Sequence, residues 1–138
     1  MNQEKLLATA LRTIDLEAAS IAGLRQFIQQ DFLQIVASIH QAKGRLVVSG
    51  IGKSAIVAQK IVATLNSTGT PSLYLHAADA IHGDLGMIQT EDIVLCISKS
   101  GDTPEIKVLA PLIKGFGNIL IGMVSNDGSF LAKQSDYV

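Results

Sequence analysis

The chain has 138 residues, of which 48% are hydrophobic and 17% charged, and its formal net charge is −1. This composition is too apolar for a disordered segment, and the lack of a basic block argues against a nucleic-acid or membrane-surface partner. The length predicts one domain. No apolar run is long enough for a membrane span, and the N-terminus lacks the pattern of a signal peptide. The single cysteine, Cys96, excludes a disulfide scaffold and favours the cytoplasm.

Two amphipathic helices are predicted before the first strand, over residues 3–19 and 25–42. Apolar side chains recur at helical spacing in both, and Gly44 follows the second helix. Two helices are more than one strand needs for cover, so we expect part of their apolar surface to form a subunit contact. Residues 1–44 are therefore interpreted as N-terminal helices and residues 45–138 as the α/β core of one domain.

A strand, a glycine turn and a helix follow one another in residues 46–66. The strand begins as an apolar, largely β-branched run, and the turn carries Gly50 and Gly52. Such a turn points backbone N–H groups and the positive end of a helix at an anion. Lys53 and Ser54 follow at once and supply a charge and a hydroxyl. A phosphate-bearing ligand is therefore the first hypothesis.

Two nucleotide-binding motifs do not fit this turn. A P-loop requires a glycine five residues before Gly52, where Val47 stands. A dinucleotide fingerprint requires a third glycine, where Ala55 stands, and an acidic residue at the end of the second strand, where His76 stands. For the glycine turn taken alone, a tight connection without any ligand stays open as an alternative.

Strands and helices alternate through the rest of the chain. The predicted elements are strands over residues 72–76, 92–97 and 118–124, helices over 104–114 and 129–134, and the start of a strand at 136–138. Gly83 and Gly86 argue against a helix in residues 76–85. The pattern predicts a three-layer α/β fold with a parallel, mostly five-stranded sheet between helices and ligands at the carboxyl ends of the strands. We expect the domain to continue beyond Val138.

Residues 98–103 repeat the features of the first turn at the end of another strand. Ser98, Ser100 and Thr103 carry hydroxyls, Gly101 lies among them, and Pro104 suits the first turn of a helix. Each hydroxyl taken singly is more typical of a cap. Three hydroxyls with free helix amides bind phosphate oxygens without a metal, so the two turns together indicate a phosphate site.

The two turns, Gly50-x-Gly52-x-Ser54 and Ser98-x-Ser100-Gly101-x-Thr103, resemble those of the sugar isomerase (SIS) domain. With the STGTPS run, the segment HGDLGM, residues 82–87, resembles its arabinose 5-phosphate isomerase branch. The resemblance implies interconversion of D-ribulose 5-phosphate and D-arabinose 5-phosphate for lipopolysaccharide or capsule synthesis. It also implies a homotetramer, and further catalytic residues beyond Val138.

By this resemblance the substrate lies between the two turns. The residues expected to bind it are Gly52, Ser54, His76, Ser98, Lys99, Ser100, Gly101 and Thr103. Aldose–ketose isomerisation moves a proton between C1 and C2 through an enediol whose oxygens need a stabilising partner. Lys53 is expected to stabilise that charge, His82 to transfer protons, and Glu105 to act as a catalytic acid. Lys99 departs from the asparagine or glutamine of the family.

Structural alternatives accompany these roles. Lys53 also fits a solvated loop lysine, His82 a turn histidine, and Glu105 a carboxylate that favours a helix N-terminus. His76, Asp79, His82 and Asp84 could also be counted as metal ligands, but His76, Asp79 and His82 lie on one face only in a helix, so we expect no metal and no cofactor.

Two other functions stay open. One is a sugar-phosphate sensor that binds without turnover, and the other is a different phosphosugar isomerase. The joint presence of Lys53, His82 and Glu105 favours catalysis, and HGDLGM favours the pentose substrate.

Overall fold

The computed structural model describes residues 2–138, which form two compact units, one up to Gln34 and one over Ile35–Val138. The elements in chain order are α1 (Gln3–Gly23), η1 (Leu24–Phe27), α2 (Gln30–Gln41), β1 (Leu46–Gly50), α3 (Lys53–Ser67), β2 (Ser72–His76), α4 (Ala77–Ile81), η2 (Asp84–Met87), β3 (Ile93–Ile97), α5 (Pro104–Gly115), β4 (Ile119–Met123) and α6 (Phe130–Gln134). Here η1 and η2 are single 3-10 turns. Among these residues no helix is both long and apolar enough to cross a bilayer.

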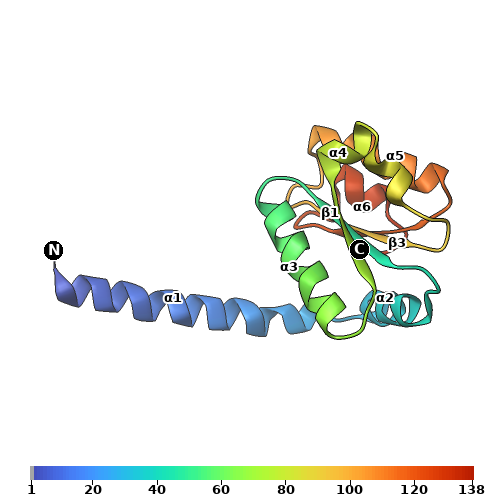
Figure 1. Cartoon of the computed structure of the whole chain (residues 1–138). Coiled ribbons are helices and arrows are strands. Elements are labelled where there is room, and N and C mark those ends of the chain that lie inside the picture. The colour runs from blue at the N-terminus through green and yellow to red at the C-terminus, as the bar shows by residue number, and fades with distance from the viewer. Residues whose placement is uncertain (1) are drawn as a thin grey trace. The chain divides into compact units, whose positions relative to one another are not determined.

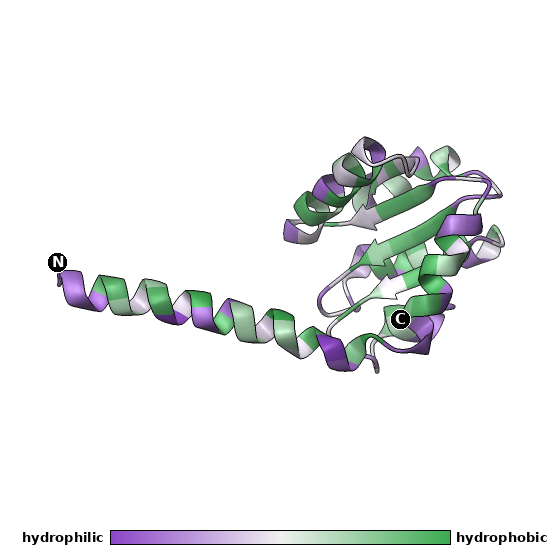
Figure 2. Cartoon of the chain, turned by 90° about the horizontal axis from the view of Figure 1, so that it is seen from below, coloured by the Kyte–Doolittle hydropathy of each residue, from purple (hydrophilic) through white to green (hydrophobic). Residues whose placement is uncertain are grey.

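The first unit consists of α1, η1 and the start of α2. The side chain of Asn2 caps α1 by accepting a hydrogen bond from the Lys5 amide, and none of the residues of α1 is buried. Apolar and polar residues alternate along this helix (Figure 2). The helix predicted over 25–42 is wrong in its first part, because the chain leaves the helical conformation at Ile28, with ψ 88°, and α2 starts at Gln30. Neither proline nor glycine marks this break in the sequence.

The second unit is built on a four-stranded, all-parallel sheet in the order β2-β1-β3-β4. α3 and the second half of α2 cover one face, and α4, α5 and α6 cover the other (Figure 1). All five residues of β1 and of β3 are buried, as expected for strands covered on both faces. The predicted three-layer α/β fold with a parallel sheet is confirmed.

At the outer edge of β4 a single parallel bridge pairs Ile121 with Tyr137. The Asp136 amide donates to the Leu120 carbonyl at 2.8 Å, and the Gly122 amide donates to the Tyr137 carbonyl at 2.9 Å. The sheet thus has four strands, and the strand predicted to start at 136–138 is represented by this bridge.

The segment after β2 is helical, which corrects the expectation drawn from its glycines. α4 runs over Ala77–Ile81, and η2 follows at Asp84–Met87. Gly83 has a φ of 136°, a conformation that side-chain-bearing residues rarely adopt. This glycine therefore ends the helix instead of excluding it.

Cys96 is the fourth of the five residues of β3 and has no solvent exposure, and this burial raises the pKa of its thiol to about 12. The thiolate is the reactive form of cysteine, and with so high a pKa almost none of it forms at neutral pH. We therefore expect the native chain to resist alkylation by iodoacetamide at pH 8, and the chain unfolded in urea to react fully. Mass spectrometry measures both, and rapid labelling of the native chain would contradict this burial.

Candidate functional site

The candidate site lies at the ends of β1 and β3, where the order of the strands in the sheet changes direction. β2 pairs with one edge of β1 and β3 with its other edge, so the turns after β1 and β3 diverge around a crevice. The four strands end level with one another, since Gly50 is paired with both His76 and Ile97, and Ile97 with Met123. A pocket of about 340 Å³, here called the serine pocket, is lined by Ile51, Ser54, Ile97, Ser98, Lys99, Ser100 and Thr103.

Two helices begin beside the serine pocket, and neither has a side-chain cap. Gly52 precedes α3 with a φ of 59°, and Thr103 precedes α5 without donating or accepting a capping bond. By contrast, the side chains of Asn2 and Ser129 cap α1 and α6. The free amides in the first turns of α3 and α5, which in α5 begin after Pro104, are therefore left for water or a ligand, and the two helix dipoles favour an anion there.

The hydroxyl of Thr103 is the clearest sign of a missing partner. Its Oγ1 atom is buried and has no hydrogen-bond partner in the described part of the chain. A buried hydroxyl without a partner costs roughly 1–3 kcal/mol. Thr103 also lines the serine pocket, so a rotation of its side chain would let this hydroxyl donate to an acceptor bound there and remove the cost.

Ser98 and Ser100 each accept one hydrogen bond within the turn and have a hydroxyl proton left to donate. Ser98 Oγ accepts a hydrogen bond from the Gly101 amide, and Ser100 Oγ accepts one from the Asp102 amide, each at 3.2 Å. A serine hydroxyl has one proton to donate besides its acceptor sites. With their acceptor roles satisfied inside the turn, both hydroxyls keep that proton for a ligand, as does the half-buried Ser54 beside them.

The charge at the pocket also favours an anion. Lys99 is exposed and lines the pocket, whereas no carboxylate does. The nearby Asp102 carboxylate forms an ion pair with Lys107 at 3.1 Å. An anion in the pocket therefore meets hydroxyls, helix amides and an ammonium group.

The expected catalytic residues lie outside the pocket lining. Lys53 is the first residue of α3 and is exposed, and Glu105 is the second residue of α5 and is half-buried. His82 follows α4 and is exposed, with its amide donating to the Asp79 carbonyl at 3.0 Å. Of the residues expected to bind substrate, Gly52 and Gly101 shape the two turns without lining the pocket.

His76 ends β2 beside Gly50, at the same edge of the sheet as the pocket. Its Nδ1 atom is buried, lies 3.6 Å from an oxygen of Asp79 and has no hydrogen-bond partner in residues 2–138. Within the same residues no group of three histidine, cysteine or acidic side chains is placed to hold a metal. The structure thus brings one pair close together, His76 and Asp79, among the four candidates His76, Asp79, His82 and Asp84.

Ile51 and Ile97 were not predicted as site residues, yet both line the pocket. Ile51 follows the buried strand β1, and Ile97 is the last residue of the buried strand β3. A sequence pattern assigns apolar residues at such positions to the core. Their position beside the turns depends on the order of the strands.

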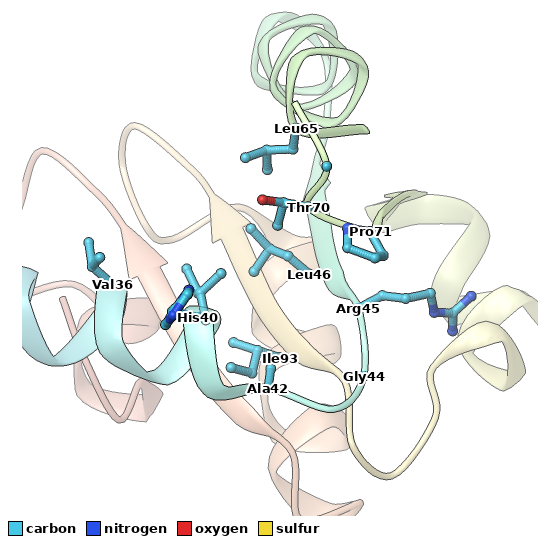
Figure 3. Close-up of a pocket in the computed structure, with 12 residues that line it drawn as sticks. Val36, His40, Ala42, Gly44, Arg45, Leu46, Leu65, Thr70, Pro71 and Ile93 are labelled. Atoms are coloured by element: carbon cyan, nitrogen blue, oxygen red, sulfur yellow. The ribbon is translucent and has the colours of Figure 1, made fainter. Parts of the chain in front are cut away.

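A second cavity, of about 450 Å³, lies at the opposite ends of the strands, where Leu46 begins β1 and Ile93 begins β3 (Figure 3). Its walls are mainly apolar, and the Arg45 side chain extends away from it. None of the buried polar atoms without a partner in the described residues belongs to this lining. The chemistry that suits a phosphate is therefore at the serine pocket.

Comparison with known proteins identifies related sequences. Residues 38–138 match the SIS domain. A Haemophilus influenzae protein named "Probable arabinose 5-phosphate isomerase" is 46% identical over 132 residues, which cover 96% of this chain and 39% of that protein. The Pseudomonas aeruginosa arabinose 5-phosphate isomerase KdsD is 49% identical over 128 residues, which cover 93% of this chain and 39% of that protein. The chain thus spans about two fifths (39%) of the length of these curated relatives.

A solved structure shows the same fold. An Escherichia coli CFT073 protein in complex with arabinose 5-phosphate superimposes with a TM-score of 0.92 at 36% identity. The superposition covers 99% of this chain and 73% of that one.

Proposed function

The chain belongs to the SIS domain family, and from this premise we propose that its serine pocket binds the phosphate of a pentose 5-phosphate. The observation that carries the proposal is Thr103, a residue that lines the pocket and whose buried hydroxyl lacks a partner in the described residues. Ser98 and Ser100 add hydroxyls whose protons are free. The curated relatives are named arabinose 5-phosphate isomerases, which supports this substrate over other sugar phosphates.

We further propose that the protein interconverts D-ribulose 5-phosphate and D-arabinose 5-phosphate through an enediol. The carbons that react, C1 and C2, are at the end of the sugar remote from the phosphate. Groups that act on them therefore need not line the pocket, which agrees with the positions of Lys53, His82 and Glu105 outside it. Lys53 is assigned to stabilise the enediolate, His82 to carry the proton and Glu105 to serve as acid.

The proposal includes neither metal nor cofactor, because the reaction moves protons and leaves the overall oxidation state unchanged. We propose a cytoplasmic homo-oligomer, with residues 1–138 as one SIS unit. The exposed apolar side chains of α1 are the surface we assign to the subunit contact. Neither nucleic acid nor membrane is among the proposed partners.

Removal of two pocket hydroxyls tests the binding site. Ser100→Ala combined with Thr103→Ala is expected to weaken the binding of ribulose 5-phosphate by roughly tenfold or more, about 1.4 kcal/mol, in titration calorimetry. The matched control is Ser67→Ala with Thr68→Ala, which also removes one serine and one threonine hydroxyl. These two lie at the far end of α3, where both donate to the Thr64 carbonyl. Unchanged affinity in the first variant would contradict the phosphate assignment.

The reaction itself is tested by NMR on the full-length protein with ribulose 5-phosphate. We expect signals of arabinose 5-phosphate to grow until the two sugars reach equilibrium. Binding without conversion would contradict the isomerase assignment and support a sensor.

A further inference from the structure

The chain segment after β4 holds the turn Ser98–Thr103 from behind. The Ser125 amide and the Ser125 hydroxyl both donate to the Lys99 carbonyl, at 3.0 and 2.8 Å. Farther along, the Leu131 amide donates to the Gly101 carbonyl at 2.9 Å. The carbonyls of Lys99 and Gly101 thus both point toward this segment.

The orientation of a carbonyl determines the orientation of the next amide. A trans peptide is planar, so the N–H of one residue points opposite to the carbonyl of the residue before it. With the Lys99 carbonyl held toward Ser125, the Ser100 N–H points away from Ser125. This N–H has no acceptor within residues 2–138, while Lys99 and Ser100 both line the serine pocket.

We propose that Ser125 is a positioning residue for anion binding, because it holds the Lys99–Ser100 peptide with its N–H available to the ligand. This inference rests on the proposed function of the serine pocket. A carbonyl oxygen has two lone pairs and can accept two hydrogen bonds, and Ser125 supplies two donors to that of Lys99. One donor leaves the peptide free to rotate about that bond, whereas two donors restrict it. The donor is thereby oriented before the ligand arrives, which lowers the cost of binding.

The Ser125 hydroxyl is not needed to form its own turn. The Asn126 side chain closes that turn by accepting from the Gly128 amide at 3.0 Å, and the Asn126 carbonyl accepts from the Ser129 amide at 3.1 Å. Ser125 is also exposed, so water would otherwise satisfy its hydroxyl. Its bond to Lys99 therefore serves the neighbouring turn.

Two substitutions test this role. Ser125→Ala keeps the amide bond to the Lys99 carbonyl and removes the hydroxyl bond, and we expect a threefold to tenfold loss of affinity for ribulose 5-phosphate and for inorganic phosphate, on the order of a single hydrogen bond. Ser125→Thr retains a hydroxyl and should restore the affinity. In the full-length protein Ser125→Ala should raise KM and leave kcat unchanged, because the phosphate does not react.

The control is Ser67→Ala. The Ser67 hydroxyl also donates to a backbone carbonyl, that of Thr64 at 2.7 Å, but it lies at the opposite end of α3. Both alanine variants should lower the melting temperature by a similar small amount, and only Ser125→Ala should change affinity. Phosphate should also shift the NMR signal of the Ser100 amide in the unaltered chain, with a smaller shift in Ser125→Ala.

The outcomes separate this inference from the proposed function. If the unaltered chain binds ribulose 5-phosphate and Ser125→Ala binds it equally well, the positioning role is overturned and the phosphate site stands. If the unaltered chain binds neither ribulose 5-phosphate nor inorganic phosphate, both are overturned. An equal loss of affinity in Ser67→Ala would show general destabilisation and also overturn the positioning role.

Discussion

Gly101→Ala is expected to weaken the binding of ribulose 5-phosphate about 100-fold, since one added methyl group displaces the turn to which we assign phosphate binding. A Cβ atom at this position would lie 2.2 Å from Ser129 Oγ and 3.2 Å from a methyl carbon of Val124. Gly101 also has a φ of 69°, which disfavours alanine. By moving, the altered turn avoids roughly 3 kcal/mol of overpacking and backbone strain, and a ligand that requires the original turn must restore this strain, which corresponds to the loss of about 100-fold.

The control for Gly101→Ala is Gly117→Ala. Gly117 has a similar φ of 81°, and a Cβ atom there would meet nothing within 4 Å. This variant carries the backbone strain without the clash, and its affinity should be unchanged. Because glycine is tolerated at an N-cap, Ser129→Gly added to Gly101→Ala should restore part of the binding. Calorimetry that finds full affinity in Gly101→Ala would show that the turn need not keep this conformation.

Asp92→Ala is expected to destabilise the fold by about 3 kcal/mol, because it removes a buried carboxylate that accepts several hydrogen bonds, while the Arg45 side chain that it leaves is 32% exposed. The Asp92 side chain has no solvent exposure and accepts hydrogen bonds from the Arg45 amide at 2.8 Å, the Arg45 guanidinium at 2.7 and 3.2 Å, and the Gln89 amide at 2.9 Å. Arg45 also donates to the Met87 carbonyl at 2.8 Å. Asp92 therefore joins the start of β1 to the segment that precedes β3, and its loss leaves these donors without an acceptor.

Urea unfolding of Asp92→Ala and of Lys107→Ala measures this effect. Lys107 pairs with Asp102, but both side chains are about half exposed, at 48% and 43%. An exposed pair of this kind contributes roughly 0–1 kcal/mol, so Lys107→Ala should unfold close to the unaltered chain. Equal stability of the two variants would contradict the structural role of the buried pair.

The same pair predicts a dependence of stability on pH. Burial by itself raises the pKa of Asp92, but hydrogen bonds from Arg45 and Gln89 outweigh it and hold that pKa below its usual range. A carboxylate with a lowered pKa stabilises the fold fully above its unfolded value of about 3.9 and loses this contribution as the pH falls through the folded value. The free energy of unfolding should therefore fall more steeply below about pH 4 in the unaltered chain than in Asp92→Asn.

Sequence patterns were sufficient for features that depend on neighbouring residues. Short apolar runs predicted the four strands, helical spacing predicted the helix after β1, and Pro104 marked the start of the helix after β3, because each of these signals lies within the element itself. Glycine and hydroxyl residues where a strand meets a helix indicated both turns of the pocket. The same local reasoning failed at Ile28, where helical spacing continues through a break, and at Gly83, which ends a helix that its presence seemed to exclude.

Contacts between distant residues required the tertiary structure. The order β2-β1-β3-β4 brings the turn at Ser54 beside the turn at Ser100, and the position of β4 brings Ser125 behind Lys99. The pairing of Arg45 with Asp92 spans 47 residues. The spacing of residues in the sequence does not reveal these pairs of charged residues or serines with their partners, because which residues meet depends on which strands lie side by side.

What the sequence alone determined is therefore the chemistry of each turn and the class of the fold. The tertiary structure decided which turns meet, that the Thr103 hydroxyl is left without a partner instead of capping α5, and that Lys53, His82 and Glu105 lie outside the lining of the serine pocket. The physical reason is range. Backbone conformation and side-chain spacing act over a few residues, whereas burial and strand pairing are settled by the whole chain at once.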